Sequence, residues 1–400
     1  MADPQHIVVV GGGLAAASAV TELRERGFDG AVTLVGAEPH VPYERPPFSK
    51  AVLTGDAEPE SAFVHPQEWY AEHDVELLLG SRVDALDLAG RTVSVAGRRI
   101  GYDRLLLATG AVPRRLPVVD DSGVPASYLR TLDDSLALRS RLRDGARVLV
   151  VGAGWIGLEV TSAARRAGAE VSVVDPAEVP LAAALGEQMG GLFADLHRGH
   201  GVDLRLRTQV TAVRQADGRA VVELSDGEQV RPDLVVVGVG ARPDTALAEE
   251  AGLATHDGIL VDATLRTSDP HVWAAGDVAN HDHPSLGRLR VEHWDTAINQ
   301  GRHAARGMLG EEEPYTAQPY FFTDQYDWGM EYVGRGGPED ELVVRGAPAE
   351  GLTAFWLRDG VVTAGMQIND WDASDTLRAL VGAAAPERLR DPGVPLADLG

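Results

Sequence analysis

Two stretches of the sequence share one pattern, in which a run of β-favouring apolar residues leads into a glycine-rich turn and then into small and apolar residues. The first stretch is IVVVGGGLAA (residues 7–16), and the second is VLVVGAGWIG (residues 148–157). An uninterrupted apolar run predicts a strand buried on both faces, and the stretches that follow predict helices. The chain is therefore predicted to be an α/β protein that contains two strand–turn–helix units.

The residues of the first turn suit the binding of a dinucleotide. Gly11 permits a tight bend, Gly13 lets backbone amides approach a pyrophosphate, and Ala16 lets the helix pack closely on the strand. Free N–H groups at the start of that helix point at an anion. A second strand, residues 32–35, ends just before Glu38, whose carboxylate can accept hydrogen bonds from the ribose hydroxyls of an adenosine. The alternative is an ordinary buried strand–turn–helix unit.

The second turn repeats every part of this arrangement. Its glycines are Gly152, Gly154 and Gly157, and the next strand, residues 171–174, ends at Asp175. Each copy independently has the strand, the turn, the helix and the distant carboxylate, so coincidence is a poor explanation of both. We therefore predict two Rossmann-like domains, each with its own dinucleotide.

The remaining patterns divide the chain into three predicted domains. A proline-rich stretch that begins at Pro113 marks a boundary, and a buried strand at residues 234–240 closes the segment inserted into the first domain. From about residue 319 the chain changes to aromatic-rich strands, followed by a helix near residues 373–380. The predicted domains are residues 1–113 with 239–318, residues 114–238, and an α+β domain at residues 319–400.

Composition excludes several classes of protein. The chain has no cysteine, which rules out disulfides, thiolate metal sites, thiolate-ligated iron–sulfur clusters and a redox-active cysteine pair. Its formal net charge of -24 disfavours binding to nucleic acid. No apolar run reaches the ~18 residues of a membrane span, and the first residues lack the features of a signal peptide. We expect a cytoplasmic protein that binds neither nucleic acid nor membrane.

Lys50 is the only lysine among the 36 lysine and arginine residues. A coding bias that replaces lysine wherever arginine suffices leaves lysine where arginine fails, although chance survival is the alternative. The proline-rich residues before Lys50 cannot begin as a strand or a helix. The chain then enters a short helix, and we expect Lys50 on its first turn.

Glu159 lies two residues past Gly157, in the first turns of a helix predicted at residues 158–166. From there its carboxylate can reach the point where a nicotinamide would enter. A glutamate in a first turn is also a common partner of the helix dipole, worth about 0.3–1 kcal/mol. Its position alone leaves both roles open.

The order of motifs along the whole chain resembles one family. After GGGLAA come RPPFSK (residues 45–50), ATG (108–110), GAGWIGLE (152–159), GVGARPD (238–244), AAGDV (274–278), EHW (292–294) and PYFFTDQ (319–325). This set resembles the FAD-dependent NADH:ferredoxin reductases of bacterial oxygenase systems, the type represented by putidaredoxin reductase and biphenyl dioxygenase reductase, with a glutathione-reductase-like fold. Apoptosis-inducing factor is a more distant member.

The resemblance implies that FAD fills the first site and that NADH binds the domain at residues 114–238. It implies that Asp277 bonds the ribityl chain, that Trp294 meets the pyrimidine end of the flavin and that Phe322 faces its ring. Arg130 contacts the FAD by the same resemblance, with a surface ion pair as the alternative.

By the same resemblance, Lys50 lies near flavin N5 and pairs with Glu159, and these two are the predicted catalytic residues. A fixed cation beside the flavin stabilises its reduced, anionic form. The predicted cofactor-binding residues are Gly11, Gly13, Leu14, Ala15, Ala16, Glu38, Arg45, Lys50, Val83, Ala108, Thr109, Gly110, Arg130, Asp277, Val278, Glu292, Trp294, Phe322, Gly152, Gly154, Trp155, Ile156, Gly157, Glu159, Asp175, Gly238 and Val239. No metal is predicted, because His281 and His283 lie in a predicted loop without further ligands.

Without cysteine, the flavin itself is the relay, which accepts a hydride and releases electrons singly. The predicted recipient is a [2Fe-2S] ferredoxin or a similar one-electron carrier that serves a monooxygenase or dioxygenase. Asp175 favours NADH, because a 2′-phosphate about 4 Å away would meet a repulsion of roughly 4 kcal/mol at an effective dielectric of about 20. Residues 180–184, PLAAA, lack the arginine that relatives often carry, which predicts weak nucleotide binding.

Two other functions stay open at this point. One is an NADH:quinone reductase or oxidase that needs no thiol, and the other is a slow flavoprotein of the apoptosis-inducing-factor type that acts mainly by binding. The oligomeric state, monomer or homodimer, also stays open.

A docking side for the acidic partner is predicted from local charge. Residues 288–306 carry four arginines against two acids, whereas residues 311–350 carry ten acids against two arginines. We expect a partner to dock on the arginine-bearing side, with a solvated helix face as the alternative.

Overall fold

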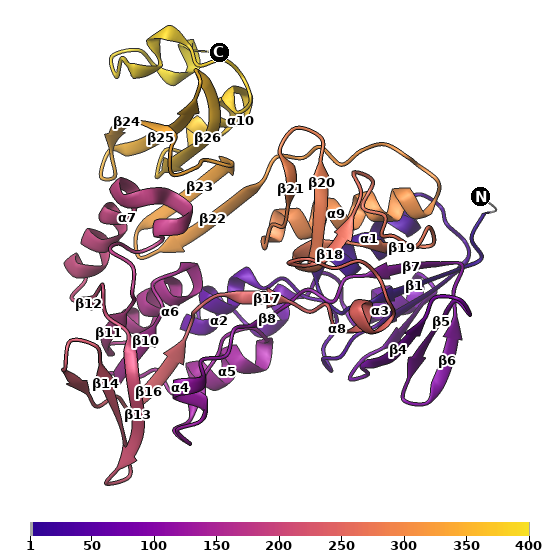
Figure 1. Ribbon diagram of the computed structural model, residues 1–400, viewed down its shortest axis with the longest axis horizontal. Coiled ribbons are helices and arrows are strands. Elements are labelled where there is room, and N and C mark those ends of the chain that lie inside the picture. Colours follow the sequence, from indigo (N-terminus) through magenta and orange to yellow (C-terminus); the bar gives the residue numbers. More distant parts are fainter. Residues whose placement is uncertain (1–2, 400) are drawn as a thin grey trace. The chain divides into compact units, whose positions relative to one another are not determined.

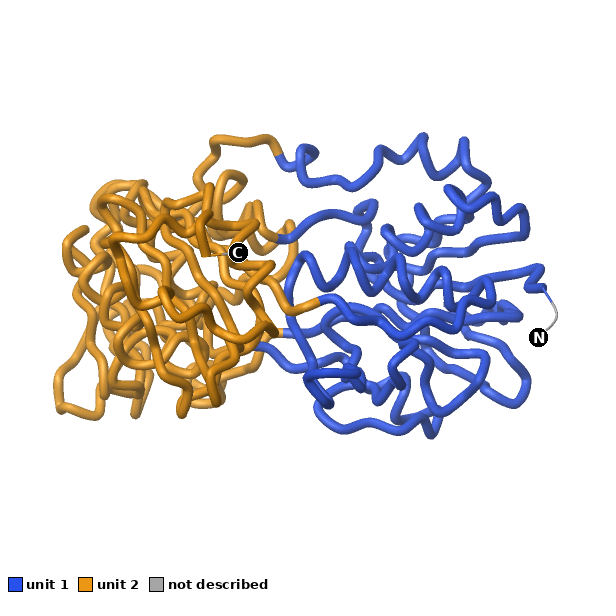
Figure 2. Tube along the Cα trace, turned by 90° about the horizontal axis from the view of Figure 1, so that it is seen from above, with its two compact units in different colours: residues 1–45, 59–112, 241–317 blue, residues 46–58, 113–240, 318–400 orange. Residues whose placement is uncertain are grey.

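The computed structural model describes residues 3–399, and the chain divides into two compact units. Unit 1 comprises residues 1–45, 59–112 and 241–317, and unit 2 comprises residues 46–58, 113–240 and 318–400 (Figure 2). Unit 2 thus contains both the predicted second dinucleotide segment, residues 114–238, and the C-terminal segment, residues 319–400. The division into three domains therefore stays a prediction.

Unit 1 is built on a five-stranded parallel sheet with the order β19-β7-β1-β2-β3, of which Figure 1 labels β19, β7 and β1. Its strands are β1 (His6–Val10), β2 (Ala31–Val35), β3 (Val75–Leu78), β7 (Arg104–Leu107) and β19 (Val272–Ala274). Every residue of β7 and β19 is buried, as expected for strands covered on both faces. The helices of this unit are α1 (Leu14–Glu25), α3 (Gln67–Glu72), α8 (Ala246–Glu250) and α9 (Trp294–Met308).

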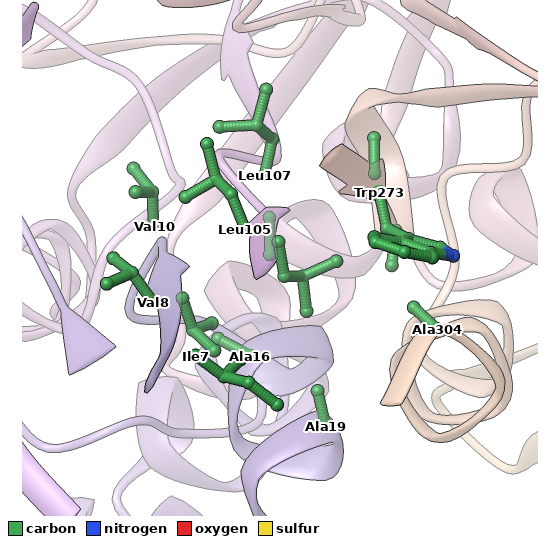
Figure 3. Close-up of a cluster of buried hydrophobic side chains, with 14 of the residues drawn as sticks. Ile7, Val8, Val10, Ala16, Ala19, Leu105, Leu107, Trp273 and Ala304 are labelled. Atoms are coloured by element: carbon green, nitrogen blue, oxygen red, sulfur yellow. The ribbon is translucent and has the colours of Figure 1, made fainter. Parts of the chain in front are cut away.

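The core of unit 1 lies where α1 and α9 meet the sheet. Figure 3 shows Ile7, Leu105 and Trp273 from three strands together with Ala16 of α1 and Ala304 of α9. All five side chains are fully buried. Their burial stabilises the fold by about 1.5–3 kcal/mol for each large apolar side chain.

Smaller sheets complete unit 1. The strands β4 (Val83–Asp87), β5 (Thr92–Val95) and β6 (Arg98–Gly101) form two antiparallel hairpins. A second sheet holds β18 (Ile259–Val261), β20 (Ala279–His283) and β21 (Gly287–Leu289), and β8 (Ala111–Pro113) pairs with β17 (Ala241–Pro243). The 3-10 helices are η2 (Pro59–Ala62) and η3 (Gly276–Val278).

The prediction of a loop at His281 and His283 was wrong. Both residues belong to β20 and are buried, because β20 pairs with β18 on one side and β21 on the other. Alternation along the strand places both imidazoles on one face. Within residues 3–399, no three histidine, aspartate or glutamate side chains gather in an arrangement that could hold a metal ion.

Unit 2 contains a second parallel sheet with the order β12-β11-β10-β16-β9. Its strands are β9 (Ala126–Ser127), β10 (Arg147–Val151), β11 (Glu170–Val174), β12 (Asp203–Arg205) and β16 (Leu234–Val237), and a smaller sheet holds β13 (Val210–Ala216), β14 (Arg219–Leu224) and β15 (Gln229–Val230). The helices are α2 (Ala51–Thr54), α4 (Pro117–Asp120), α5 (Leu132–Arg139), α6 (Trp155–Arg166) and α7 (Ala182–Gly199), and the 3-10 helix η1 (Pro46–Ser49) precedes α2.

The C-terminal part of unit 2 is an antiparallel sheet with the order β22-β23-β26-β25-β24. Its elements are β22 (Tyr320–Gln325), β23 (Trp328–Gly334), β24 (Glu341–Ala347), β25 (Gly351–Arg358), β26 (Val361–Ile368), the helix α10 (Ser374–Leu380), and the 3-10 helices η4 (Trp371–Ala373), η5 (Glu387–Arg390) and η6 (Leu396–Asp398). Aromatic contacts join this sheet to the rest of the unit, with ring centroids 4.7 Å apart for Trp155 and Phe321 and 5.5 Å apart for Phe193 and Trp328.

Most predicted helices are present, with shifted ends. The helix after the second glycine turn begins at Trp155 rather than at residue 158, because Gly154 serves as its N-cap. No helix in the described part of the chain is both long and apolar enough to span a bilayer.

Candidate functional site

The first glycine turn has a backbone that only glycine adopts without strain. Gly11 has a φ of +131°, and a Cβ there would lie 2.1 Å from the carbonyl oxygen of Ala108. The amide of Gly11 donates to Val35 O at 2.8 Å, so the turn is held between β2 and the end of β7. The predicted bend is confirmed, and its cause is the close approach of the 108–110 segment.

The N-terminus of α1 is open to an anion. Its N-cap is Gly13, which offers no side-chain hydrogen bond, so the first backbone N–H groups of the helix lack a side-chain cap. The helix also packs tightly at this end, because a Cβ at Gly301 of α9 would lie 2.3 Å from Ala15 O. Leu14 and Ala15, both predicted to bind the cofactor, form the first turn of α1.

Arg45 stands between two predicted cofactor-binding carboxylates of unit 1. Its Nη2 donates to Glu38 Oε1 at 3.1 Å, and the hydroxyl of Tyr43 donates to Glu38 Oε2. Burial works to lower the pKa of Arg45, but Tyr43, Glu38 and Asp277 outweigh it and raise that pKa. Arg45 therefore holds a positive charge beside Glu38 and Asp277, on the side of the sheet where the glycine turn lies.

The other predicted residues of unit 1 lie at the ends of the same elements. Thr109 Oγ1 donates to Asp244 O at 2.7 Å, which fixes the segment that follows β7. Arg290 Nη1 donates a hydrogen bond to the carboxylate of Glu292 and another, at 3.1 Å, to the backbone oxygen of Asp277. The remaining positions are Ala108, which directly follows β7, Gly110, which has a φ of +71°, Val83, the first residue of β4, Val278 in η3, and Trp294, the first residue of α9.

The second glycine turn in unit 2 has the same geometry as the first. Gly152 has a φ of +109°, and a Cβ there would lie 2.4 Å from Gly238 O. A Cβ at Gly157 would lie 2.1 Å from Gly152 O. The backbones of Gly152, Gly157 and Gly238 therefore lie too close together for a side chain. The N-cap of α6 is Gly154, again with no side-chain hydrogen bond. This is a second helix N-terminus that suits a phosphate.

Asp175 is tied into this turn. Its Oδ2 accepts from the amide of Ala153 at 2.7 Å and its Oδ1 accepts from the amide of Ala177 at 2.8 Å. The carboxylate is thus held at the end of β11, where the sequence predicted it. In α6 Ile156 is exposed and Trp155 is half-buried, and Val239, which follows Gly238 after β16, is also half-buried.

Lys50 and Glu159 are brought together within unit 2. Lys50 Nζ lies 2.8 Å from Glu159 Oε1, and the two side chains are 17% and 4% exposed. Lys50 is the N-cap residue of α2, one position before the helix, so the expectation that it lies on the first turn was wrong. The two prolines before it instead begin the 3-10 turn η1, and the backbone of Lys50 joins the two short helices.

Three further contacts surround this ion pair. Ser49 Oγ donates to Glu159 Oε2, and Thr323 Oγ1 of β22 donates to Glu159 Oε1 at 2.6 Å. Lys50 Nζ lies 5.4 Å from the ring centroid of Phe322, within the range of a cation–π contact. The buried carboxylate therefore has three donors, which compensate its loss of hydration.

Sequence reasoning missed the hydroxyl donors of this site. Ser49 and Thr323 lie within the motifs RPPFSK and PYFFTDQ, but hydroxyl residues are common, and only the tertiary fold brings both to Glu159. Tyr43, which bonds Glu38, was missed for the same reason. The weak signal for Ser49 and Thr323 was a place inside a motif already singled out, and Tyr43 lies two residues before the motif RPPFSK.

The structure gives contacts for Arg130 and for the arginine-bearing side. The backbone amide of Arg130 donates to Asp134 Oδ2 at 3.1 Å, just before the capping box that starts α5, and a contact of its guanidinium with FAD stays a prediction. On the arginine-bearing side, the salt-bridge partners are Asp282 for Arg288, Asp257 and Glu292 for Arg290, and Glu22 for Arg306. Acids from other parts of unit 1 thus offset the local positive balance, and docking there stays a prediction.

With this geometry in hand, comparison with known proteins is decisive. The chain matches the model of the pyridine nucleotide-disulphide oxidoreductases over residues 5–301 and a reductase C-terminal model over residues 320–400. The chain belongs to the pyridine nucleotide-disulphide oxidoreductase family. The ferredoxin–NAD(+) reductase component of an anthranilate 1,2-dioxygenase system from Burkholderia cepacia is 41% identical over 402 residues, which cover 99% of this chain and 98% of that relative.

Other relatives also match this chain over nearly its whole length. Putidaredoxin reductase from Pseudomonas putida is 34% identical, with 98% of this chain and 96% of that relative covered. The crystal structure of the covalent putidaredoxin reductase–putidaredoxin complex has a chain that matches with a TM-score of 0.94 at 34% identity, covering 99% of this chain and 98% of that one. The resemblance and the α/β fold predicted from the sequence are confirmed.

Family membership makes the protein an oxidoreductase and implies FAD and NAD(H) as its cofactors. The two glycine turns, each with no room for a Cβ, and the two helix N-termini without side-chain caps fit the pyrophosphates of two dinucleotides. The disulphide in the family's name has no counterpart here, because the chain contains no cysteine.

Proposed function

We propose that the protein is an FAD-dependent reductase that takes a hydride from NADH and passes single electrons to a [2Fe-2S] ferredoxin of an oxygenase system. The observation that carries the proposal is the Lys50–Glu159 pair in a chain with two dinucleotide turns and no thiol. When bound, FAD supplies the change from a two-electron to a one-electron donor. Relatives named as ferredoxin reductases support the choice of recipient.

In this proposal unit 1 holds the adenosine and pyrophosphate of FAD. The N-terminus of α1 receives the phosphates, since its first N–H groups have no side-chain cap and Gly13 has no side chain that could cover them. Glu38 binds ribose hydroxyls, and Arg45 orients its carboxylate. Asp277 accepts hydrogen bonds from the ribityl hydroxyls, and its place on η3, just after β19, supports this role.

Unit 2 contributes NADH binding and the charge that favours reduction. The N-terminus of α6 binds the NADH pyrophosphate, and Asp175 disfavours a 2′-phosphate by repulsion. Lys50 holds a positive charge that stabilises the reduced, anionic flavin, and Glu159 keeps the ammonium oriented. We include a cytoplasmic location in the proposal, because NADH is regenerated there.

An anaerobic titration of the FAD-loaded protein with NADH tests this function. We expect the yellow flavin absorbance to bleach with one NADH per flavin, and the reduced protein to reduce a [2Fe-2S] ferredoxin rapidly. Treatment with a thiol reagent should change neither step. A flavin that NADH bleaches only slowly, with a persistent charge-transfer band, would contradict the reductase role and favour a protein that acts by binding.

A further inference from the structure

A line of hydrogen bonds leaves the buried carboxylate of Glu159 and crosses the interior of unit 2. Thr323 Oγ1 lies 2.6 Å from Glu159 Oε1, and Gln325 Nε2 lies 3.1 Å from Thr323 Oγ1. His197 Nε2 lies 2.8 Å from Gln325 Oε1, and the Tyr326 hydroxyl lies 3.2 Å from His197 Nδ1. We call these four residues, Thr323, Gln325, His197 and Tyr326, the glutamate chain.

The fold explains why polar residues can be buried here. Thr323 and Gln325 alternate along β22 and share its buried face, each 1% exposed. His197 comes from α7 and is fully buried, and the exposed His200 stacks on Tyr326 with centroids 3.7 Å apart. The amide of Tyr326 donates to Ser162 Oγ of α6 at 2.9 Å. The residues of the glutamate chain thus connect three elements, β22, α7 and α6.

The direction of every hydrogen bond follows from the ionised carboxylate. Glu159 pairs with Lys50 and can only accept, so Thr323 must donate its single proton to it. The oxygen of Thr323 must then accept from Gln325, which places the NH₂ group of Gln325 toward Thr323 and its carbonyl oxygen toward α7.

The same elimination fixes the histidine tautomer. Because the Gln325 oxygen accepts, His197 Nε2 carries the proton and Nδ1 is bare, so Nδ1 accepts from the Tyr326 hydroxyl. Burial lowers the pKa of His197 to about 4, which keeps the imidazole neutral, as this pattern requires. All four donors therefore point toward Glu159, and bonds aligned in this way strengthen one another in a low dielectric.

We propose that the glutamate chain positions Glu159 and, through it, holds the Lys50 ammonium in place. Thr323, Gln325, His197 and Tyr326 are positioning residues, since Glu159 and Lys50 stand between them and any reacting group. The consequence for hydride transfer rests on the proposed function, whereas the positioning itself does not.

The other groups near Lys50 do not replace this restraint. On β22, Asp324 is the second carboxylate close enough to act on Lys50, and burial together with Glu159 raises its pKa while Lys50 opposes the rise. Phe322 offers its ring at 5.4 Å, a contact without a fixed direction. Ser49 donates to the other oxygen of Glu159, and it is the residue directly before Lys50 in the chain. The glutamate chain is thus the restraint that reaches Glu159 from α7 and β22.

The single lysine of the chain allows a direct test. Protein labelled with ¹³C and ¹⁵N only in lysine gives one side-chain signal set, that of Lys50, in the FAD-loaded oxidised protein. Relaxation of its Cε and Nζ nuclei reports the order parameter, and exchange of the ammonium protons with water reports how long the ion pair stays closed. Neither measurement requires turnover.

We expect Thr323→Val, which keeps the shape but removes the hydroxyl, to lower the Lys50 side-chain order parameter relative to that of the unaltered protein. Proton exchange should become several-fold faster. Thr323→Ser should restore both values. Glu159→Gln should give the lowest Lys50 order parameter and the fastest proton exchange, because it removes the ion pair.

A second variant tests the far end of the glutamate chain and stays informative if Thr323→Val does not fold. Tyr326→Phe removes one hydroxyl from a half-buried side chain, and we expect a smaller change in the same direction. Its control is Tyr320→Phe, which removes a hydroxyl that bonds Glu331 from the same region of chain. That control should leave the Lys50 signals unchanged.

The proposal is overturned if Tyr326→Phe, or Thr323→Val where it folds, moves the Lys50 signals no more than Tyr320→Phe does. A protein that lacks reductase activity but shows these shifts would leave the positioning intact and refute only the proposed function.

Discussion

At the scale of the residue, Lys50 shows why one side chain resists replacement. Its ammonium fits between Glu159 and the ring of Phe322, and a planar guanidinium has a different shape and different hydrogen-bond directions. The chain uses arginine at every other basic position. The ion pair therefore agrees with the interpretation that arginine fails at this one place.

Substitution of Lys50 should separate charge from shape. We expect Lys50→Met to slow flavin reduction by NADH by about 10²-fold, the range for loss of one preorganised electrostatic contact. Lys50→Arg should rescue little of this loss, because the larger group cannot occupy the same place. Stopped-flow absorbance under anaerobic conditions measures the rate, and a fully active Lys50→Arg variant would contradict the account.

Residues that follow a local rule could be predicted from the sequence, and residues that depend on distant contacts could not. Gly11 and Glu38 follow from the strand–turn–helix pattern, whose spacing is set by the backbone. Ser49 and Thr323 lie 274 positions apart, and no local pattern says that both reach Glu159. Recognition of Glu159 itself depended on the family resemblance, because its position alone suited a helix-dipole partner equally well.

At the scale of the element, the glycine turns set the distance between backbone segments. The strands and helices around both turns were predicted correctly, because uninterrupted apolar runs and glycines are local signals. The strand β20 was missed because its sequence, ANHDH, is largely polar. It forms a strand only through pairing with β18 and β21.

The second turn should not tolerate a single methyl group. We expect Gly152→Ala to abolish tight NADH binding, because the Cβ would lie 2.4 Å from Gly238 O and the φ of +109° is strained for alanine. The matched control is Gly191→Ala in α7, where the Cβ would meet nothing within 4 Å and where alanine favours the helix by about 0.5–1 kcal/mol. Calorimetric titration with NAD⁺ compares the two, and normal binding by Gly152→Ala would contradict the model of the turn.

The carboxylate after β11 should affect both specificity and the turn. We expect Asp175→Ala to reduce the preference for NADH over NADPH and to destabilise the unit by about 1–3 kcal/mol, since two backbone amides lose their acceptor. Asp226→Ala, which removes one acceptor from an exposed turn, is the control. Ratios of kcat/KM for the two nucleotides decide the case, and an NADPH preference in the unaltered protein would refute the role of Asp175.

At the scale of the whole molecule, each compact unit contains one deeply buried histidine with a depressed pKa. Burial lowers the pKa of His197 in unit 2 and of His281 in unit 1 from 6.5 to about 4. Both imidazoles are neutral in the folded protein at pH values where the unfolded chain binds protons. The stabilisation is present above pH 6.5 and is lost as the pH falls toward 4.

The expected loss is up to about 3 kcal/mol for each histidine. Denaturation by urea at a series of pH values measures it, and His197→Phe should flatten the pH dependence of the transition that reports unit 2. A free energy of unfolding that stays constant between pH 6.5 and 4 would show that these histidines are not held neutral.

Docking of an acidic ferredoxin is also a property of the whole molecule, because the net charge of -24 opposes it. If the arginine-bearing side guides the partner, KM for ferredoxin should rise with ionic strength, and Arg302→Gln should raise KM without changing flavin reduction by NADH. Steady-state kinetics over a range of salt concentrations measures the effect. A KM that stays constant or falls would rule out attraction at this side.

If FAD binds as we propose, it would divide the electron pair of NADH between two ferredoxin molecules without help from sulfur, since the chain has no cysteine. An anaerobic assay of limiting NADH with excess [2Fe-2S] ferredoxin tests it most directly. The account predicts two ferredoxins reduced for each NADH, at an unchanged rate after treatment with a thiol-blocking reagent. Ferredoxin that stays oxidised while NADH is consumed would contradict it.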